Sequence, residues 1–162
     1  MGSRLLYLLL AAGVFLADRL TKSLVETALA LHETRIVIPD FLHLVHVRNQ
    51  GIAFGLFSDS PSAWRSVALV SLSALALAGV GYMLWTACAS ASQQKLALAL
   101  IFGGATGNLF DRVRRGAVTD FLDFFIGSWH WPAFNLADSA IVSGVALLLL
   151  VLLRSERRPR SH

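Results

Sequence analysis

Most of the carboxylates that could do chemistry in this 162-residue chain have a polar partner about one helical turn away. The pairs are Asp18 with Lys22 (i,i+4), Asn108 with Asp111 (i,i+3) and Asn135 with Asp138 (i,i+3). This spacing places both members of a pair on one face of a helix. Such a pair can belong to a functional site, or it can simply hold two helices together. For the first two pairs the sequence supports both readings equally.

Two further carboxylates, Asp120 and Asp123, lie in the stretch VTDFLDFF (118–125), whose apolar side chains favour partial burial and raised pKa values. When two carboxyl groups share a site, one tends to stay protonated while the other is ionised. The ionised group can take a proton from water and the protonated one can donate to a carbonyl oxygen, as in aspartic proteases. We therefore consider an acid pair formed by Asp138 and one of these two aspartates, and spacing alone leaves both open.

Other catalytic groups fit less well. Cys88 is the sole thiol and lies at the far end of a long apolar stretch. A Ser–Lys dyad needs a lysine, but Lys22 has an aspartate one turn away and Lys95 is expected on the opposite side of the membrane. His43 and His46 have opposite parity in a strand and would face opposite ways, which argues against a histidine metal site. Elimination leaves carboxylates, and no metal or organic cofactor is expected.

The composition excludes most soluble classes. Hydrophobic residues make up 56% of the chain and charged residues 15%, and the mean hydropathy is +0.63. A soluble domain carries about a quarter charged residues. The formal charge of +4 does not indicate nucleic-acid binding, because four of the 14 Lys and Arg residues lie in the last nine positions. The chain is predicted to be a small polytopic membrane protein with one domain, residues 1–162.

Four apolar stretches predict four membrane-spanning helices, at about 5–26, 65–88, 94–111 and 135–154. Only the second has an uncharged run, residues 66–94, well above the roughly 20 residues that a span needs. Each of the others must draw a flanking carboxylate toward the membrane, namely Asp18, Asp111 and Asp138. Since spans one and three run in the same direction and span four runs back, the three carboxylates are expected at the same leaflet.

Two segments on that side, 31–63 and 112–134, connect the spans. In the first, RIVI (35–38) and FLHLVHV (41–47) predict two short strands around a turn. The tryptophans of WHWP (129–132) are expected in an interfacial aromatic belt. The basic tail, 154–162, favours a cytoplasmic C-terminus and, with an even number of spans, a cytoplasmic N-terminus. A plain count of basic residues on the two sides disagrees, but several on the outer side adjoin carboxylates.

Five motifs in order connect these features. They are DRLTK (18–22), NQGIAF (49–54), GGATGNLFDR (103–112), VTDF (118–121) and FNLADS (134–139). Together with four spans, the chain resembles the lipoprotein signal peptidases, the bacterial type II signal peptidases, over roughly residues 5–153. The resemblance implies a membrane all-α fold of four transmembrane helices, with a small extracytoplasmic β-sheet cradle between helices one and two.

The resemblance also implies a function. Members of this family are intramembrane aspartic endopeptidases of the bacterial cytoplasmic (inner) membrane. They remove the signal peptide from diacylglyceryl-modified prolipoproteins, cutting just before the lipidated cysteine near the outer leaflet. Expected partners are these substrates, membrane lipids and globomycin-type inhibitors.

Residue by residue, the family pattern makes Asp120 and Asp138 the catalytic dyad. The positions that match its site-lining or supporting residues are Asn49, Asn108, Arg112, Asn135, Asp18, Lys22 and Asp111. Within GGATG (103–107), Gly103 and Gly107 are four apart, which indicates close helix packing.

Two functions of other classes compete with the peptidase. A small proton- or ion-coupled transporter would also use intramembrane aspartates. Carboxylates gathered at one leaflet and the lack of an internal repeat argue against it. A non-catalytic membrane scaffold would use the polar pairs only to hold helices together, and would then tolerate asparagine at positions 120 and 138.

Overall fold

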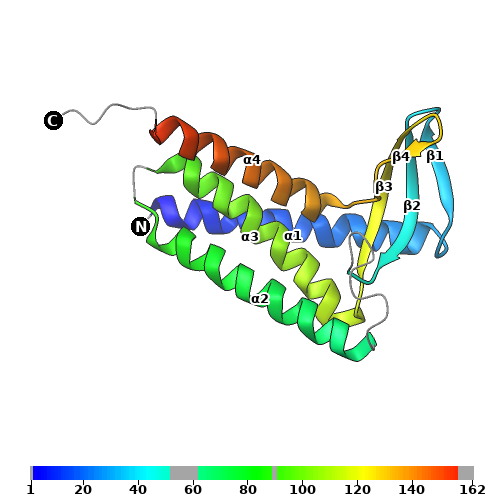
Figure 1. Cartoon of the computed structure of the whole chain (residues 1–162), viewed down its shortest axis with the longest axis horizontal. Coiled ribbons are helices and arrows are strands. Elements are labelled where there is room, and N and C mark those ends of the chain that lie inside the picture. Colours follow the sequence, from blue (N-terminus) through cyan, green and yellow to red (C-terminus); the bar gives the residue numbers. More distant parts are fainter. Residues whose placement is uncertain (1, 52–61, 89–90, 157–162) are drawn as a thin grey trace.

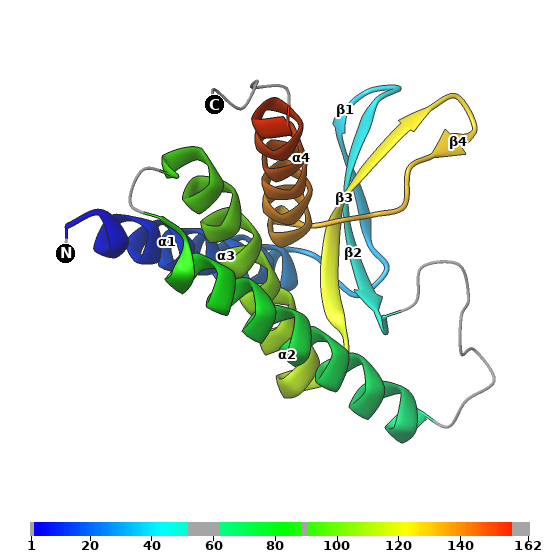
Figure 2. The same cartoon turned by 60° about the vertical axis from the view of Figure 1, so that its left-hand side comes forward.

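Four long helices form over the apolar stretches of the sequence, and a small sheet lies at one end of them, away from both termini (Figures 1 and 2). The computed structural model describes residues 2–51, 62–88 and 91–156. In chain order the elements are α1 (Gly2–Ala28), β1 (Thr34–Ile38), β2 (Leu42–Asn49), α2 (Ser62–Thr86), α3 (Ser92–Arg115), β3 (Val118–Ile126), β4 (Trp129–His130) and α4 (Leu136–Glu156).

Two of these helices are long and apolar enough to cross a membrane by length and composition. They contain Trp64–Thr86, with a mean hydropathy of 2.1, and Leu136–Arg154, with a mean hydropathy of 2.4. Their large side chains point outward: Leu75 of α2 is 72% exposed and Val142 of α4 is 67% exposed. An apolar surface of this kind suits hydrocarbon and not water. The other two helices, α1 and α3, carry polar side chains that pack against each other.

Helix α3 is the centre of the bundle and contacts all three other helices. Its glycines allow this. A Cβ atom at Gly103 would lie 2.5 Å from the Ala11 carbonyl oxygen of α1, and one at Gly104 would lie 2.5 Å from the Ala137 carbonyl oxygen of α4. Small residues permit such close backbone approach between helices in membranes. The prediction that the GGATG stretch serves helix packing is confirmed.

These close contacts predict a selective effect of alanine substitution. Gly104→Ala should lower the thermal stability of the purified protein in detergent, at a cost of about 1–3 kcal/mol for overpacking. Gly79→Ala in α2 is the matched control, because a Cβ there meets nothing within 4 Å. The control should be neutral or slightly stabilising. Equal melting temperatures for the two variants would contradict the packing described here.

The sheet is antiparallel with strand order β1-β2-β3-β4. The predicted strand pair in the first outer segment is confirmed as β1 and β2. The expectation that the sheet forms only between the first two helices was wrong, because β3 and β4 come from the segment between α3 and α4. Strand β3 carries apolar side chains on both faces, with Asp120 on one face and Asp123 on the other, so it lacks the alternation that marks a half-buried strand. Residues 52–61 of the first outer segment and 157–162 of the tail lie outside the described residues.

The sheet is anchored on the end of α1. Val25, Leu29 and Phe121 form a buried apolar cluster there, with Leu44, Leu122 and Leu136 packed around it. His46 of β2 adds a hydrogen bond, with its Nδ1 3.0 Å from the Leu29 carbonyl oxygen. The packing therefore places the beginning of β3 against the end of α1 and the beginning of α4. Polar side chains from all three elements meet at this junction.

Candidate active site

Asp120, the third residue of β3, is held by two asparagine amides. Its side chain is only 2% exposed. Asn135 Nδ2 donates to Asp120 Oδ1 at 2.7 Å, and Asn49 Nδ2 donates to Asp120 Oδ2 at 2.9 Å. Asn49 comes within reach because β2 and β3 pair, with Val47 opposite Asp120 in the register. Each carboxyl oxygen thus has one amide donor, which fixes the orientation of the group.

Asp138 lies in the first turn of α4 and takes part in a capping box. Asn135 is the N-cap: its Oδ1 accepts from the Asp138 backbone N–H at 3.0 Å, while Asp138 Oδ2 accepts from the Asn135 backbone N–H at 3.3 Å. The other oxygen, Asp138 Oδ1, accepts from Asn108 Nδ2 of α3 at 2.7 Å. The side chain is partly exposed, whereas that of Asp120 is buried.

A chain of amides connects the two carboxyl groups. Asn135 Nδ2, which donates to Asp120, is also 3.3 Å from Asn108 Oδ1, and Asn108 in turn donates to Asp138. Four elements, β2, β3, α3 and α4, therefore supply one hydrogen-bonded network around two carboxyl groups. The structure brings together the members of the expected acid pair and three of the asparagines assigned to the site.

The two carboxyl groups differ in environment. Burial raises the pKa of the Asp120 carboxyl from its ordinary value of 3.8 to about 6, and the negative charge of Asp138 also raises it. The hydrogen bonds from Asn49 and Asn135 act in the opposite direction, because they favour the ionised carboxylate. One member of the pair therefore retains a proton at a pH where an ordinary aspartate has lost it.

Behind this network lies a buried ionic cluster centred on Lys22. The Lys22 ammonium is 2.8 Å from Asp18 Oδ2 and 2.8 Å from Asp111 Oδ2, and it donates to Asn108 Oδ1 at 2.9 Å. Arg19 also pairs with Asp111. Lys22, Asp18 and Asp111 are all at most 1% exposed. The cluster joins α1 to α3 and orients the asparagine that bonds to Asp138.

Asp18 also fixes the beginning of α4. Its Oδ1 accepts a hydrogen bond from the Ala137 backbone N–H at 3.0 Å. The first N–H groups of a helix have no partner within the helix, and a carboxylate there is favoured by the helix dipole. The approach requires a glycine at position 107, because a Cβ there would lie 2.5 Å from Asp18 Oδ2. The pair Asp18–Lys22 therefore fits both expected roles, because it holds helices together and also adjoins the acid pair.

The positive charge of Arg112 in α3 interacts with both carboxyl groups of the acid pair. Its strongest charge interactions are with Asp138 and Asp120, ahead of its neighbour in sequence, Asp111. Asp111 is instead engaged by Lys22 and Arg19. The Arg112 Nε atom is buried and has no hydrogen-bond partner among the described residues. Asp111 therefore does not depend on Arg112, its neighbour in sequence, for a positive partner.

Asp123, the other candidate for the acid pair, lies elsewhere. Its carboxyl is 3.0 Å from His130 Nδ1 and 3.4 Å from His43 Nδ1, so it links β2, β3 and β4 within the sheet. Within residues 2–51, 62–88 and 91–156, no group of three or more His, Cys, Asp or Glu side chains is arranged to hold a metal ion. The geometry favours Asp120 over Asp123 as the partner of Asp138.

Sequence reasoning did not anticipate two contacts of this region. It gave no role to Arg19, whose partner Asp111 is 92 residues away, and no local signal could have shown that pair. It also did not foresee the backbone hydrogen bond from Ala137 to Asp18, since the acceptor is 119 residues away. Cys88, set aside as a catalyst, is exposed.

The fold and site together define a membrane enzyme with two carboxyl groups held by amides at one end of an apolar helical bundle. The sequence profile of the family described as Signal peptidase (SPase) II matches residues 10–154. The chain belongs to this family and is therefore an aspartic endopeptidase that removes signal peptides from prolipoproteins.

Individual relatives agree with this assignment. The chain is 49% identical to the lipoprotein signal peptidase of Solibacter usitatus over 148 residues, which is 91% of this chain and 90% of that protein. It is 45% identical to the lipoprotein signal peptidase of Desulforapulum autotrophicum, over 90% of each chain. A solved structure described as a bacterial membrane enzyme, determined at 2.3 Å by the in meso method, superposes with a TM-score of 0.84 at 30% identity. That match covers 96% of this chain and 92% of the other.

Proposed function

We propose that Asp120 and Asp138 are the catalytic dyad of this peptidase. The observation that carries the proposal is the asparagine network that holds both carboxyl groups at one junction, with no comparable arrangement around Asp123 in the described part of the chain. Asn49, Asn108 and Asn135 position the two carboxyl groups. Lys22, Asp18 and Asp111 support that network from behind.

The reaction follows from the unequal protonation of the pair. The ionised carboxylate takes a proton from a water molecule as the water oxygen attacks the scissile carbonyl carbon, and the protonated carboxyl donates to the carbonyl oxygen. The resulting gem-diol collapses as the C–N bond breaks. The leaving nitrogen accepts the proton that the first carboxylate took from water, and a gem-diol hydroxyl returns its proton to the second carboxylate. Because burial raises the pKa of Asp120 to about 6, we assign Asp120 as the proton donor and Asp138 as the base.

The substrate class sets where this site must be. We propose that all four helices span the bacterial inner membrane, with both termini cytoplasmic and the dyad near the outer leaflet. Arg154 at the end of α4 and the basic residues that follow it in sequence support this orientation. Trp129 and Trp131, 58% and 56% exposed beside the sheet, suit the interface on the dyad's side. A diacylglyceryl-modified prolipoprotein would enter from the bilayer and be cut before its lipidated cysteine.

The pH dependence of cleavage tests the assignment of the proton donor. With Asp120 as the donor, kcat/KM should fall as the pH rises above about 6, approaching tenfold per pH unit. Asn49→Ala removes a hydrogen bond that favours the ionised form, so it should move this descending limb to higher pH. The measurement is cleavage of a lipidated peptide across the pH range. A limb that moves to lower pH, or stays in place, would contradict the assignment.

A direct assay separates the peptidase from its competitors. Purified protein should convert a diacylated prolipoprotein to a faster-migrating product on a gel, and a globomycin-type inhibitor should block the conversion. Cleavage without inhibition would contradict the proposed inhibitor class. Ion flux in proteoliposomes without any cleavage would favour the transporter instead.

A further inference from the structure

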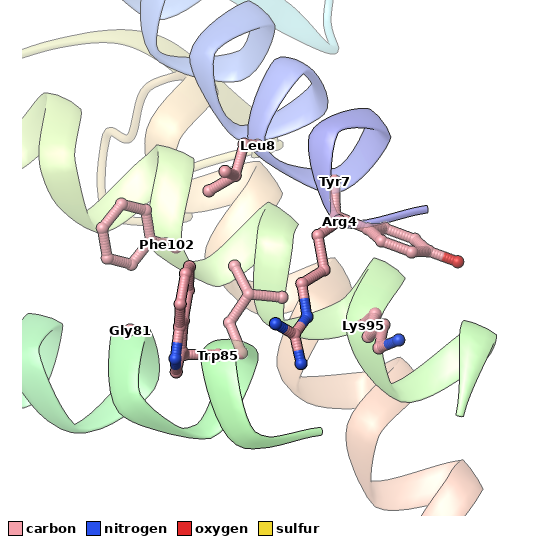
Figure 3. A pocket seen from close by; sticks show the side chains of 8 residues that line it. Arg4, Tyr7, Leu8, Gly81, Trp85, Lys95 and Phe102 are labelled. Atoms are coloured by element: carbon pink, nitrogen blue, oxygen red, sulfur yellow. The ribbon is translucent and has the colours of Figure 1, made fainter. Parts of the chain in front are cut away.

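A pocket lies at the end of the bundle opposite the dyad, between α1, α2 and α3 (Figure 3). Its lining residues come from the beginning of α1, the end of α2 and the first half of α3. They are Arg4, Tyr7, Leu8, Gly81, Leu84, Trp85, Lys95 and Phe102. The pocket encloses about 80 Å³, which is room for a short stretch of hydrocarbon but not for a peptide. Nothing in the peptidase reaction uses it.

The inner part of the pocket is apolar, and it stays open because position 81 has no side chain. Leu84 is buried, and Leu8 and Phe102 complete the walls. A Cβ atom at Gly81 would lie 3.0 Å from Cε2 of Phe102, so any larger side chain there would enter the space in front of that ring. The glycine therefore keeps open this apolar part of the pocket, formed by Leu8, Gly81 and Phe102, which we call the trough.

Two cationic side chains, Arg4 and Lys95, line the pocket beside aromatic rings. The Arg4 guanidinium lies 5.1 Å from the centre of the Trp85 ring, and the Lys95 ammonium lies 5.9 Å from the centre of the Tyr7 ring. Figure 3 shows the Arg4 side chain reaching into the space between Trp85 and Lys95. Among the described residues that line the pocket, none is acidic. Of the two cations in the lining, Arg4 is exposed and Lys95 is only 2% exposed, so Arg4 is the one that a head group can reach.

We propose that this pocket binds an anionic phospholipid. Its phosphate would lie against the exposed Arg4 guanidinium, and the beginning of one acyl chain would follow Leu8, Gly81 and Phe102. Basic pockets between membrane helices bind anionic head groups in this way. A soluble phosphate would use the Arg4 charge but leave the trough empty, and a zwitterionic lipid would gain less from that charge. Under the orientation proposed above, the ligand comes from the inner leaflet.

Arg4 and Trp85 have the side chains expected at the level of the head groups. An indole prefers the membrane interface, and a long basic side chain reaches from hydrocarbon depth to the polar layer. The bound lipid would connect three helices at the end of the bundle remote from the dyad. Its loss should therefore affect lipid retention and stability, while the chemistry at Asp120 and Asp138 continues.

Native mass spectrometry of the full chain tests the proposal. Protein released from detergent with phosphatidylglycerol, or with phosphatidylcholine of the same acyl chains, should retain one phosphatidylglycerol in preference. Arg4→Gln should weaken that retention about fivefold, as expected for one cation near a phosphate. The matched control is Arg154→Gln, which removes an exposed cation at the same end of the bundle but outside the pocket. Gly81→Leu should fill the trough and weaken retention with the charges intact.

Several results would overturn the proposal. Equal retention of the two lipids would remove the role of the head-group charge, and equal losses in Arg4→Gln and Arg154→Gln would indicate general surface charge. Retention unchanged by Gly81→Leu would exclude the acyl-chain site. Competition by soluble glycerophosphoglycerol as strong as by the lipid would point to a free phosphate ligand. Prolipoprotein cleavage measured on the same samples keeps this test separate from that of the dyad.

Discussion

Asp120→Asn and Asp138→Asn should each reduce prolipoprotein cleavage by at least about 10³-fold while the protein remains folded in the membrane. Asparagine keeps the size and shape of aspartate, but it can neither take a proton from water nor donate one as an acid. Two amides donate to Asp120, and one of them can keep the asparagine oxygen as its acceptor. The measurement is single-turnover cleavage of a diacylated prolipoprotein by purified protein.

Asp123→Asn is the matched control, since it makes the same chemical change three residues along the same strand. Its carboxyl contacts His43 and His130, and it has no contact with the asparagine network. A much milder loss is expected. A loss as severe as that of Asp120→Asn would show that the wrong aspartate has been assigned. Near wild-type cleavage by Asp120→Asn or Asp138→Asn would end the dyad proposal altogether.

Lys22→Met should destabilise the protein severely, by about 3–5 kcal/mol, because it removes the cation that two buried carboxylates share. Asp111 keeps Arg19, but Asp18 loses its only ion pair among the described residues. Asp18 and Asp111 each lie 2.8 Å from the Lys22 ammonium, and neither can reach water. The change would also disturb Asn108, which loses one of its two donors and which donates to Asp138. The expected result is a large fall in melting temperature in detergent, with cleavage lost in proportion.

Arg115→Met provides the matched control for this variant. It removes a cation from another ion pair between α1 and α3, that of Arg115 with Glu26, which is partly exposed. Exposed pairs contribute about 0–1 kcal/mol, so the change in melting temperature should be small. A double variant, Lys22→Met with Asp18→Asn, should be less destabilised than Lys22→Met alone, because it removes the carboxylate that Lys22→Met leaves without an ion pair. Additive losses would contradict the buried-cluster account.

The sequence was informative wherever the signal was local. Hydropathy placed four helices, and the i,i+3 spacing of Asn135 and Asp138 predicted that these two side chains lie close together. The capping box that they form at the beginning of α4 was not predicted. The resemblance to a known family selected Asp120 over Asp123, which spacing alone had left open. The stretches RIVI (35–38) and FLHLVHV (41–47), on either side of a turn, predicted β1 and β2.

The sequence was least informative about contacts between distant segments. Strand β3 was considered only for its carboxylates, and its pairing with β2 is what brings Asn49 to Asp120. Arg19 was given no role, although it shares Asp111 with Lys22. The pocket between Arg4 and Lys95 joins three helices and has no signature in any one of them.

The amino-acid sequence by itself determined the class of this protein, its helical segments and the residue types available for catalysis, because hydropathy and helical spacing act over a few residues at a time. Only the tertiary structure decided which amide bonds to which carboxyl group, that Lys22 serves two aspartates from two helices, and that burial raises the pKa of Asp120 to about 6. Those properties depend on distances and solvent access between segments up to about a hundred residues apart, which the packing of α1, α3, β3 and α4 sets.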